Sequence, residues 1–201
     1  MATIAMAGMQ RVPNRLVDLR ILKGFLDPAE CAWLIAAIDA RRRPSTIADD
    51  SGEAAFRTSE TCELDMADPR VTAIDRRIAD LLGIDPAYGE PLQGQRYAVG
   101  QEFKPHTDYF EPTGIDYHRF CAKTGQRTWT AMLYLNVPEA GGATRFKAID
   151  KTVQPETGKL VCWNNLGPDG RVNGATLHQG MKVRAGVKYV VTKWFRERVW
   201  G

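Results

Sequence analysis

Histidine and cysteine, the residue types that most often bind transition metals or act as nucleophiles, are scarce in this sequence. Its 201 residues include three histidines and four cysteines. The cysteines are Cys31, Cys62, Cys121 and Cys162. They lie far apart and form neither a C-x-x-C pair nor a compact metal-binding spacing, so they indicate neither a thiolate metal site nor cysteine catalysis. We interpret them as reduced thiols that pack as small apolar side chains.

Long apolar runs and a strong charge of one sign are also missing. No segment approaches the ~20 apolar residues of a transmembrane helix, and residues 1–15 are too short and too polar for the apolar part of a signal peptide. We therefore expect a cytoplasmic protein that contacts no membrane. The net charge is only +3, from 27 Lys and Arg against 24 Asp and Glu, and most basic residues are scattered along the chain. Nucleic acid is accordingly not an expected partner.

The composition is otherwise that of an ordinary globular protein. Hydrophobic residues make up 44% of the chain, charged residues 25% and aromatic residues 9%. The sequence contains no internal repeat, low-complexity tract or linker that would divide it. Length and composition therefore predict one domain over residues 1–201.

Two helices with one apolar face each are predicted in the first part of the chain. The first begins at Asp27, an N-cap residue followed by proline and by Glu30 at the third helical position. The second begins at Asp68 in a similar way and ends at Gly83, where a C-terminal cap belongs. Between the helices, residues 43–60 are polar and rich in turn-forming residues, which predicts a mobile surface loop.

From residue 91 the sequence changes to short β-branched and aromatic runs separated by Gly, Pro and Asn turns. The predicted strands are 92–99, 103–108, 128–137, 143–147, 159–163, 174–178 and 187–196. Short strands without intervening helices favour a sandwich, jelly roll or barrel over a parallel α/β sheet. The long segment 109–127 interrupts them, and we expect it to form a lid over a substrate. It contains His118, which we interpret as a solvated loop residue.

Two of the three histidines form a candidate metal site. His106 and Asp108 lie two residues apart at the end of a predicted strand, so their side chains project to the same face. By itself, however, an H-x-D pair is equally compatible with a histidine and an aspartate that lie on the surface and bind no metal. His178 lies on a late strand, and two histidines with one carboxylate form the triad that holds non-haem Fe(II) with three open positions. The same three ligands with a water molecule describe a catalytic zinc site, which remains an alternative.

Lys188 lies near the start of the predicted strand 187–196. Alternation places Lys188 and Trp194 on one face of this strand, and Tyr189 and Phe195 on the other. If the first face points into the protein, Lys188 requires an anionic partner, because an unpaired buried charge is costly. If the second face is internal, Lys188 is solvated. Periodicity alone is compatible with both arrangements.

Five short signals follow one another in the second part of the chain. They are H-x-D at 106–108, Y-L-N at 134–136, G-G-x-T at 141–144, H-x-G at 178–180 and a lysine ten residues after the last histidine. With the flanking residues, and with Arg57-Thr58-Ser59 earlier in the chain, this ordered set resembles the prolyl 4-hydroxylase family of Fe(II)- and 2-oxoglutarate-dependent oxygenases. The ordered set is far more specific than any single motif.

The resemblance implies a fold and a set of site residues. The expected fold is mainly β, with a double-stranded β-helix (jelly-roll) core at about 90–198, preceded by a helical region at about 15–85. By position, His106, Asp108 and His178 match the iron ligands of the family, and Lys188 matches the base that binds the distal carboxylate of 2-oxoglutarate. Tyr97 and Thr144 match hydroxyl groups that help to hold this cosubstrate. Without the motif set, both would be interpreted as ordinary core residues.

The resemblance also implies a substrate groove. Arg127 and Trp194 match groove residues of the family, and Glu90 matches a groove acid. A tryptophan at a pocket mouth offers a flat surface to a proline ring. The sequence departs from the family at two positions: Phe103 stands where several members have tyrosine, and Arg196 where some have a groove histidine. The metal residues are intact, whereas these departures predict a peptide site that differs from that of collagen-type enzymes.

The implied activity is hydroxylation of prolyl residues in a peptide or protein. Fe(II), 2-oxoglutarate and O2 would be required, succinate and CO2 released, and ascorbate is an expected reductant; no catalytic residue is required beyond the metal ligands. One alternative is a 2-oxoglutarate-dependent hydroxylase of a free amino acid or another small molecule. A second is a non-catalytic jelly-roll module that binds or senses oxygen and 2-oxoglutarate, although the intact triad and Lys188 argue against lost turnover.

Overall fold

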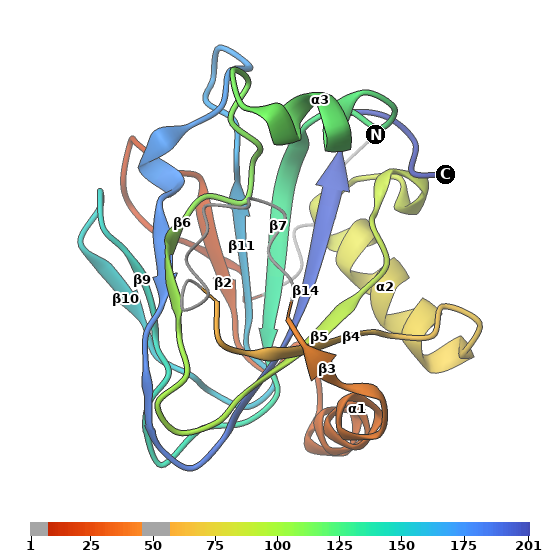
Figure 1. Ribbon diagram of the computed structural model, residues 1–201, viewed down its shortest axis with the longest axis vertical. Coiled ribbons are helices and arrows are strands. Elements are labelled where there is room, and N and C mark those ends of the chain that lie inside the picture. Colours follow the sequence, from red (N-terminus) through yellow and green to blue (C-terminus); the bar gives the residue numbers. More distant parts are fainter. Residues whose placement is uncertain (1–7, 46–56) are drawn as a thin grey trace.

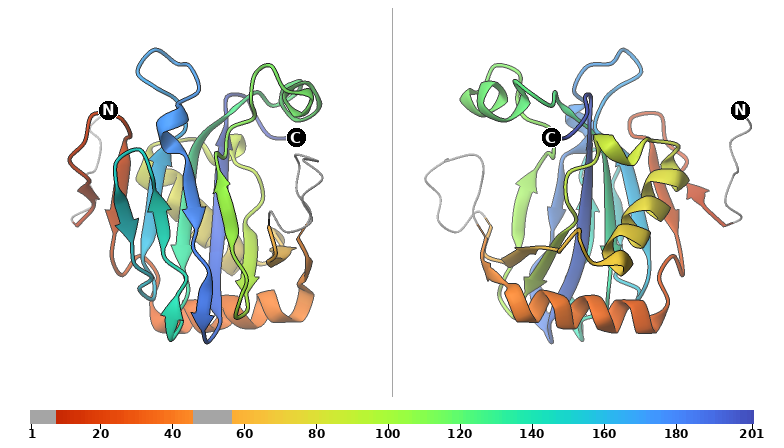
Figure 2. Two further views of the ribbon diagram at one scale, coloured as in Figure 1. Left: turned by 60° about the vertical axis from the view of Figure 1, so that its left-hand side comes forward. Right: turned by 90° about the vertical axis from the view of Figure 1, so that its right-hand side faces the viewer.

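Two antiparallel sheets packed face to face form the centre of the protein, and two helices cover the outer face of the larger sheet (Figures 1 and 2). The structure is a computed structural model that describes residues 8–45 and 57–201. Paired antiparallel sheets of this kind are the arrangement expected of a jelly-roll core, so the predicted fold class is confirmed. In the described part of the chain, no helix is long and apolar enough to cross a membrane.

The larger sheet has eight strands in the order β1-β2-β11-β7-β14-β5-β4-β3. The strands are β1 (Gln10–Arg11), β2 (Leu19–Leu22), β11 (Leu160–Asn164), β7 (Arg127–Tyr134), β14 (Lys188–Arg196), β5 (Gln93–Tyr97), β4 (Glu60–Glu63) and β3 (Arg43–Pro44). The long strands β7 and β14 pair at its centre, from Val190 opposite Tyr134 to Arg196 opposite Arg127. This register sets which residues of β14 face the space between the two sheets.

The smaller sheet has four strands in the order β10-β9-β12-β6. They are β10 (Lys151–Val153), β9 (Thr144–Phe146), β12 (His178–Gly180) and β6 (Phe103–His106). A third, two-stranded sheet joins β8 (Ala140–Gly141) to β13 (Val183–Ala185). Two 3-10 turns, η1 (Pro86–Tyr88) and η2 (Gly174–Thr176), complete the connections. The strand predicted at 174–178 is therefore wrong for its first part, because Asn173 caps a 3-10 turn and the strand begins only at His178.

Both predicted helices are present. In α1 (Pro28–Arg41) the Asp27 side chain accepts from the backbone of Glu30 and the Glu30 side chain accepts from that of Asp27, which completes the capping box. In α2 (Pro69–Leu82) Asp68 caps the start, and Gly83 ends the helix in the left-handed conformation at φ 69.

The sequence predicts a helical region at about 15–85, but the structure also contains strands there. Strands β2 and β4 belong to the larger sheet, where β2 pairs with β11 and β4 pairs with β5. Their four-residue length gave no usable periodicity, and their partners lie far along the chain. The loop predicted at 43–60 lies mostly outside the described residues. Its described ends carry β3 and the first residue of β4.

Two apolar clusters lie on opposite sides of the larger sheet. One lies between the sheets and includes Tyr134, Phe146 and Trp163. The other lies between the larger sheet and the helices, and includes Ile78 of α2 and Phe195 of β14. Every residue of β14 is buried as a consequence.

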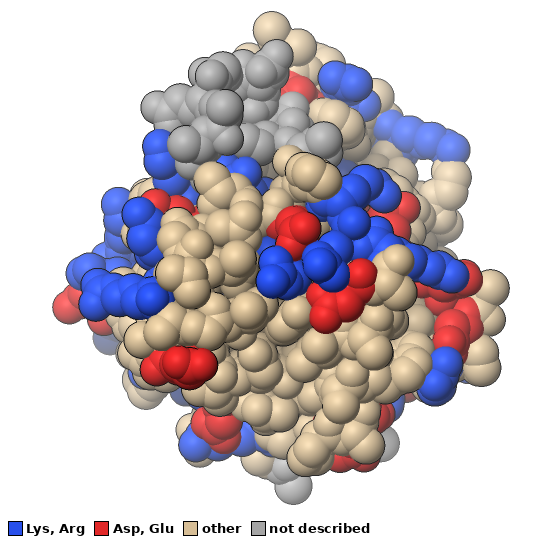
Figure 3. All heavy atoms as spheres, turned by 60° about the horizontal axis from the view of Figure 1, so that its bottom comes forward, with Lys and Arg blue, Asp and Glu red and all other residues tan. Residues whose placement is uncertain are grey.

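Charged side chains of both signs are interspersed on the surface around α1 (Figure 3). Several of them pair with each other, as Arg42 and Arg96 do with Glu60. Among the described residues this mixture agrees with the small net charge.

Candidate metal and cosubstrate site

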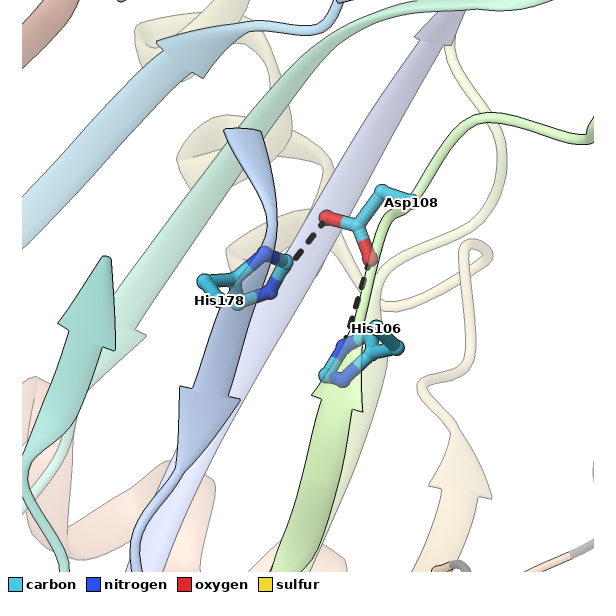
Figure 4. A group of neighbouring side chains, drawn as sticks. All are labelled: His106, Asp108 and His178. Atoms are coloured by element: carbon cyan, nitrogen blue, oxygen red, sulfur yellow. Dashed lines mark ion pairs between the residues drawn. The ribbon is translucent and has the colours of Figure 1, made fainter. Parts of the chain in front are cut away.

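His106 and His178 lie opposite each other on neighbouring strands of the smaller sheet. Strands β6 and β12 are antiparallel, and His178 pairs directly with His106 in their register. The centroids of the two imidazole rings lie 4.3 Å apart. Asp108 follows His106 by two residues, and its carboxylate points between the two rings (Figure 4). Pairing of distant strands therefore assembles the three residues that the sequence suggested.

The ligand atoms of this triad are close enough to share one ion. One such atom from each of His106, Asp108 and His178 lies within 4.8 Å of the others. His106 Nε2 lies 3.7 Å from Asp108 Oδ1, and His178 Nε2 lies 4.0 Å from Asp108 Oδ2. These separations suit donors arranged around a single metal ion rather than a hydrogen-bonded cluster.

The other nitrogen of each histidine is fixed by the backbone. His106 Nδ1 lies 2.7 Å from the carbonyl oxygen of Lys104, and His178 Nδ1 lies 3.0 Å from that of Thr176. A carbonyl can only accept, so each Nδ1 carries a proton. In the neutral imidazole this leaves the Nε2 lone pair facing the centre of the triad. Outer contacts of this kind orient metal-binding histidines.

Burial and charge favour the protonation states that bind a metal. Burial, followed by the proximity of His178, lowers the pKa of His106 to about 3. Burial by itself raises the pKa of the Asp108 carboxyl, but the two facing histidines and the Thr130 hydroxyl lower it by more. At neutral pH His106 is therefore neutral and Asp108 is ionised, as metal binding requires.

Thr130 and Asn165 support the carboxylate, and the sequence analysis did not identify either. The Thr130 hydroxyl donates to Asp108 Oδ2 at 2.7 Å, and Asn165 Nδ2 donates to the Thr130 oxygen at 3.0 Å. Both residues are fully buried. The sequence did place Thr130 on a predicted strand, but its partner Asp108, just after β6, cannot be deduced from local sequence.

One pocket joins the triad to the predicted cosubstrate residues. Seven of the nine predicted site residues line it: Tyr97, His106, Asp108, Thr144, His178, Lys188 and Trp194. Lys188 is 2% exposed, so the first of the two orientations of β14 is correct. The other face of β14 is also buried, against the helices, which explains why periodicity did not discriminate.

Lys188 is a buried amine without a carboxylate partner in the described part of the chain. Its amine lies 5.1 Å from the ring centroid of Tyr97 and 5.3 Å from that of Tyr134. Burial lowers the pKa of this amine to about 7. A buried amine that is not neutralised by the protein fits an anionic group of a ligand.

Hydroxyl groups near Lys188 are held in short chains of hydrogen bonds. The Tyr97 hydroxyl donates to Gln95 Oε1 at 2.8 Å. The Thr144 hydroxyl lies 2.6 Å from that of Tyr134, which also donates to a backbone carbonyl. Gln95 and Tyr134 were not predicted as site residues. Their contacts hold the two predicted hydroxyls in fixed orientations around the pocket.

The three predicted groove residues form one cluster. Arg127 donates to Glu90 through Nε at 2.7 Å and Nη2 at 2.9 Å. The guanidinium carbon of Arg127 lies 3.9 Å from the ring centroid of Trp194. Of the three, Trp194 lines the pocket, whereas Arg127 and Glu90 do not. Glu90 is 7% exposed, and Arg127 links it to Trp194.

The segment 109–127 carries a short helix, α3 (Ile115–Cys121), beside one end of the sheets (Figure 2). Gln126 closes its base, because its side-chain amide donates to the Phe110 carbonyl at 2.7 Å and accepts from the Phe110 amide at 2.8 Å. His118 lies on the exposed side of α3. Phe103, one of the two departures from the family pattern, stacks on His106 with ring centroids 3.5 Å apart.

The side chains present fit a divalent metal and a dicarboxylate. Two imidazole nitrogens and one carboxylate leave coordination positions open toward the pocket, which suits a non-haem iron that must also bind small ligands. Lys188 and the surrounding hydroxyls supply the cation and donors that a second carboxylate needs.

Comparison with known proteins agrees with this geometry. The family model of the 2OG-Fe(II) oxygenase superfamily matches residues 92–196. Prolyl 4-hydroxylase subunit alpha-3 of Mus musculus is 38% identical over 145 residues, which are 71% of this chain and 26% of that protein. The chain thus spans about a quarter of the length of the curated relatives it matches.

Solved structures show the same fold. The viral collagen prolyl hydroxylase of Paramecium Bursaria Chlorella virus-1, in its 2OG complex, superposes with a TM-score of 0.71 at 28% identity, covering 89% of this chain and 95% of that one. A prolyl hydroxylase of Trichoplax adhaerens, in complex with a peptide fragment of hypoxia inducible factor, superposes with a TM-score of 0.65 at 14% identity, covering 89% of this chain and 83% of that one. The second likeness concerns the fold alone.

Proposed function

This chain belongs to the 2OG-Fe(II) oxygenase superfamily, and from that premise we propose that it is a dioxygenase that hydroxylates prolyl residues of a peptide or protein. Family membership implies Fe(II), 2-oxoglutarate and O2 as requirements. The proposal for the substrate is supported by relatives named as prolyl 4-hydroxylases and by a groove in which a tryptophan lies beside an arginine.

His106, Asp108 and His178 would hold the metal through Nε2, one carboxylate oxygen and Nε2. Together, Fe(II), 2-oxoglutarate and O2 supply oxidative decarboxylation of the 2-oxo acid to succinate and CO2, coupled to hydroxylation of a substrate C–H bond. The protein contributes orientation. The Lys104 and Thr176 carbonyls keep both imidazoles in the metal-binding tautomer, and no general base is required.

Lys188 would bind the distal carboxylate of 2-oxoglutarate, with Tyr97 and Thr144 as neighbouring hydroxyl groups. A charge-assisted hydrogen bond in a buried pocket is stronger than a neutral one, which favours a dicarboxylate over a monocarboxylate. The aromatic rings of Tyr97 and Tyr134 exclude water around the amine. Trp194 would face the substrate, and its indole offers a flat apolar surface to a pyrrolidine ring.

The observation that carries the proposal is the buried Lys188 in the same pocket as the triad. A hydrolytic zinc centre uses three protein ligands and a water, and it gives no reason for an unpaired cation beside them. Lys188 is explained if a dicarboxylate binds the metal with one end and places its second carboxylate next to the amine.

The test is succinate formation by protein reconstituted with Fe(II), 2-oxoglutarate and O2, with and without proline-containing peptides. We expect peptide-stimulated succinate and one added oxygen atom on proline, detected by mass spectrometry. Slow succinate that no peptide stimulates, with a hydroxylated free amino acid or other small molecule, would instead establish the small-molecule alternative. Bound metal and 2-oxoglutarate without any succinate would contradict an enzyme and indicate a binding module.

We also propose that the protein is located in the cytoplasm, because all four cysteines are buried free thiols. Reduced cysteines are typical of that compartment.

A further proposal concerns the reductant. We also propose that ascorbate sustains turnover by returning iron to the reduced state. Its omission should shorten the linear phase of the succinate assay without changing the initial rate.

A further inference from the structure

Two arginines lie directly opposite each other at the end of the central strand pair. Arg196 of β14 is the cross-strand partner of Arg127 of β7. Like charges at directly opposed positions destabilise a sheet unless another group separates them. The carboxylate of Glu90 does so, with Oε1 2.7 Å from Arg127 Nε and 2.6 Å from Arg196 Nε.

The cluster formed by Arg127, Glu90 and Arg196 has one more positive charge than negative charge. Glu90 is the one acid that forms an ion pair with either arginine in the described part of the chain. All three residues have little exposed side chain: 17% for Arg127, 9% for Glu90 and 2% for Arg196. Within this cluster the two positive charges and the single negative charge leave a net charge of +1. The Asp108 carboxylate also attracts Arg127 from outside the cluster, but as a proposed metal ligand it would be balanced by the ion.

The two arginines differ in their exposure and in the partners of their nitrogens. Arg196 Nε is buried and, although close to Glu90, makes no hydrogen bond. Arg196 Nη1 donates to the Gly125 carbonyl at 2.8 Å and to the Phe120 carbonyl at 3.3 Å, at the base of α3. Arg127 Nη1 has only a long contact of 3.4 Å, to the backbone carbonyl of Asp108. Arg127 is also the more exposed of the two. Because Arg196 is almost fully buried, a ligand can reach this positive charge only through Arg127, whose guanidinium lies next to Asp108 and over the ring of Trp194, which lines the pocket.

We propose that the groove selects substrates with a carboxylate next to the reacting group, and that Arg196 creates this preference by sharing Glu90 with Arg127. This inference rests on the proposed function for the identity of the reacting group. Arg127 would bind the carboxylate, and Arg196 is a positioning residue that does not touch it. Three sources present the same chemistry: an acidic residue beside proline, the free C-terminus of a peptide that ends in proline, and free proline.

Direct binding tests the charge preference separately from turnover. The protein is loaded with Zn(II), which does not react with O2, and with 2-oxoglutarate, and peptide binding is measured by calorimetry. The probes are capped peptides with Asp or Asn beside proline, peptides ending in proline with a free or amidated C-terminus, and proline against prolinamide. We expect the carboxylate form of at least one pair to bind about tenfold more tightly or better, with a preference that weakens as salt increases.

Three variants assign the preference to the cluster. Arg196→Gln removes the excess charge and should bring the two members of the preferred pair to similar affinity. Arg198→Gln is the matched control, because Arg198 donates to the carbonyls of Cys121, Ala122 and Lys123 and has no ion pair with Glu90; it should keep the wild-type preference. Glu90→Gln raises the net charge and should strengthen the preference, which provides a second test if Arg196→Gln does not fold.

Equal affinity for both members of every probe pair would overturn the inference and leave the proposed function intact. A preference that persists in Arg196→Gln would overturn the role of Arg196. Hydroxylation of the bound probes is then measured separately with the Fe(II) protein. Tight, charge-dependent binding without hydroxylation of any proline would refute prolyl hydroxylation while confirming the carboxylate preference.

Discussion

Thr130 holds Asp108 by a hydrogen bond of 2.7 Å from the opposite sheet, since Thr130 lies on β7 and Asp108 follows β6. The bond links the larger sheet directly to the carboxylate of a proposed metal ligand. It also fixes the orientation of this carboxylate, whose Oδ1 faces His106 and whose Oδ2 faces His178. Asn165 donates in turn to Thr130, so removal of one hydroxyl leaves two buried groups without a partner.

Thr130→Val is therefore expected to weaken metal binding by about 10- to 100-fold, the usual cost of removing an outer contact to a metal ligand. The affinity is measured by competition with a coloured chelator. Thr128→Val is the matched control, because Thr128 lies on the same strand and donates to the Phe195 carbonyl instead. Equal affinities for wild type and Thr130→Val would show that Asp108 needs no support from β7.

His178→Ala should abolish 2-oxoglutarate turnover, because a two-ligand site does not retain the metal at the concentrations of the assay. The fold should persist, since the backbone pairing of β12 does not depend on the imidazole. Metal content by mass spectrometry and circular dichroism check both parts. His118→Ala, which alters an exposed residue of α3, should keep full activity. Retained activity in His178→Ala would remove His178 from the site.

How much the sequence could predict depended on whether a feature was local. The caps at Asp27 and Gly83 and the H-x-D pair are short-range patterns, and the structure contains them as expected. The support given by Thr130 and Asn165 joins three segments that are distant in sequence, so no window of neighbouring residues contains it. The motif set located the pocket, whereas the contacts that orient its residues required the structure.

Strand β14 shows why periodicity failed at the most informative position. Lys188 and Lys193 point to opposite faces of this strand, and both are buried. Alternation of apolar and polar residues indicates the inner face only when the other face meets water. Here one face meets the smaller sheet and the other meets the helices, so each lysine is buried for a different reason.

The stability of the ligand-free protein should rise with pH above about 7 because of Lys188. Burial lowers the pKa of its amine to about 7 in the folded state, whereas an unfolded lysine titrates near 10.4. Between these values the unfolded chain binds more protons, and the free energy of unfolding therefore increases with pH. Lys188→Met should be more stable than wild type near neutral pH, and the difference should shrink as pH rises. Urea denaturation at several pH values measures it; a constant difference would contradict the low pKa.

Binding of 2-oxoglutarate should restore the proton to Lys188, because a nearby carboxylate favours the charged amine. At about pH 8 we expect proton uptake on binding, seen by calorimetry as a heat that depends on the ionisation enthalpy of the buffer. Lys188→Ala should abolish the uptake and raise the 2-oxoglutarate requirement about 10- to 100-fold, since one charge-assisted contact contributes ~1.5 to 3 kcal/mol. Buffer-independent heat in the wild type would indicate that the cosubstrate carboxylate binds elsewhere.

Lys193 is neutralised on the helix side by Asp75 of α2, and this buried ion pair should contribute to fold stability rather than to chemistry. Its stem passes beneath Gly89, where a Cβ would lie 2.2 Å from Lys193 Cε. Breaking the pair by Asp75→Asn leaves a buried charge and should cost about 3 to 5 kcal/mol of unfolding free energy.

The double variant Asp75→Leu with Lys193→Met tests whether stability requires the two charges themselves or only that neither charge is left unpaired. A buried ion pair replaced by apolar groups of similar volume is often neutral or stabilising, so the double variant should recover most of the stability lost in Asp75→Asn. Urea denaturation gives the free energies of unfolding, and 2-oxoglutarate affinity serves as a control that should not change in either folded variant. If the double variant were as unstable as Asp75→Asn, the charges themselves, and not their neutralisation, would hold α2 against β14.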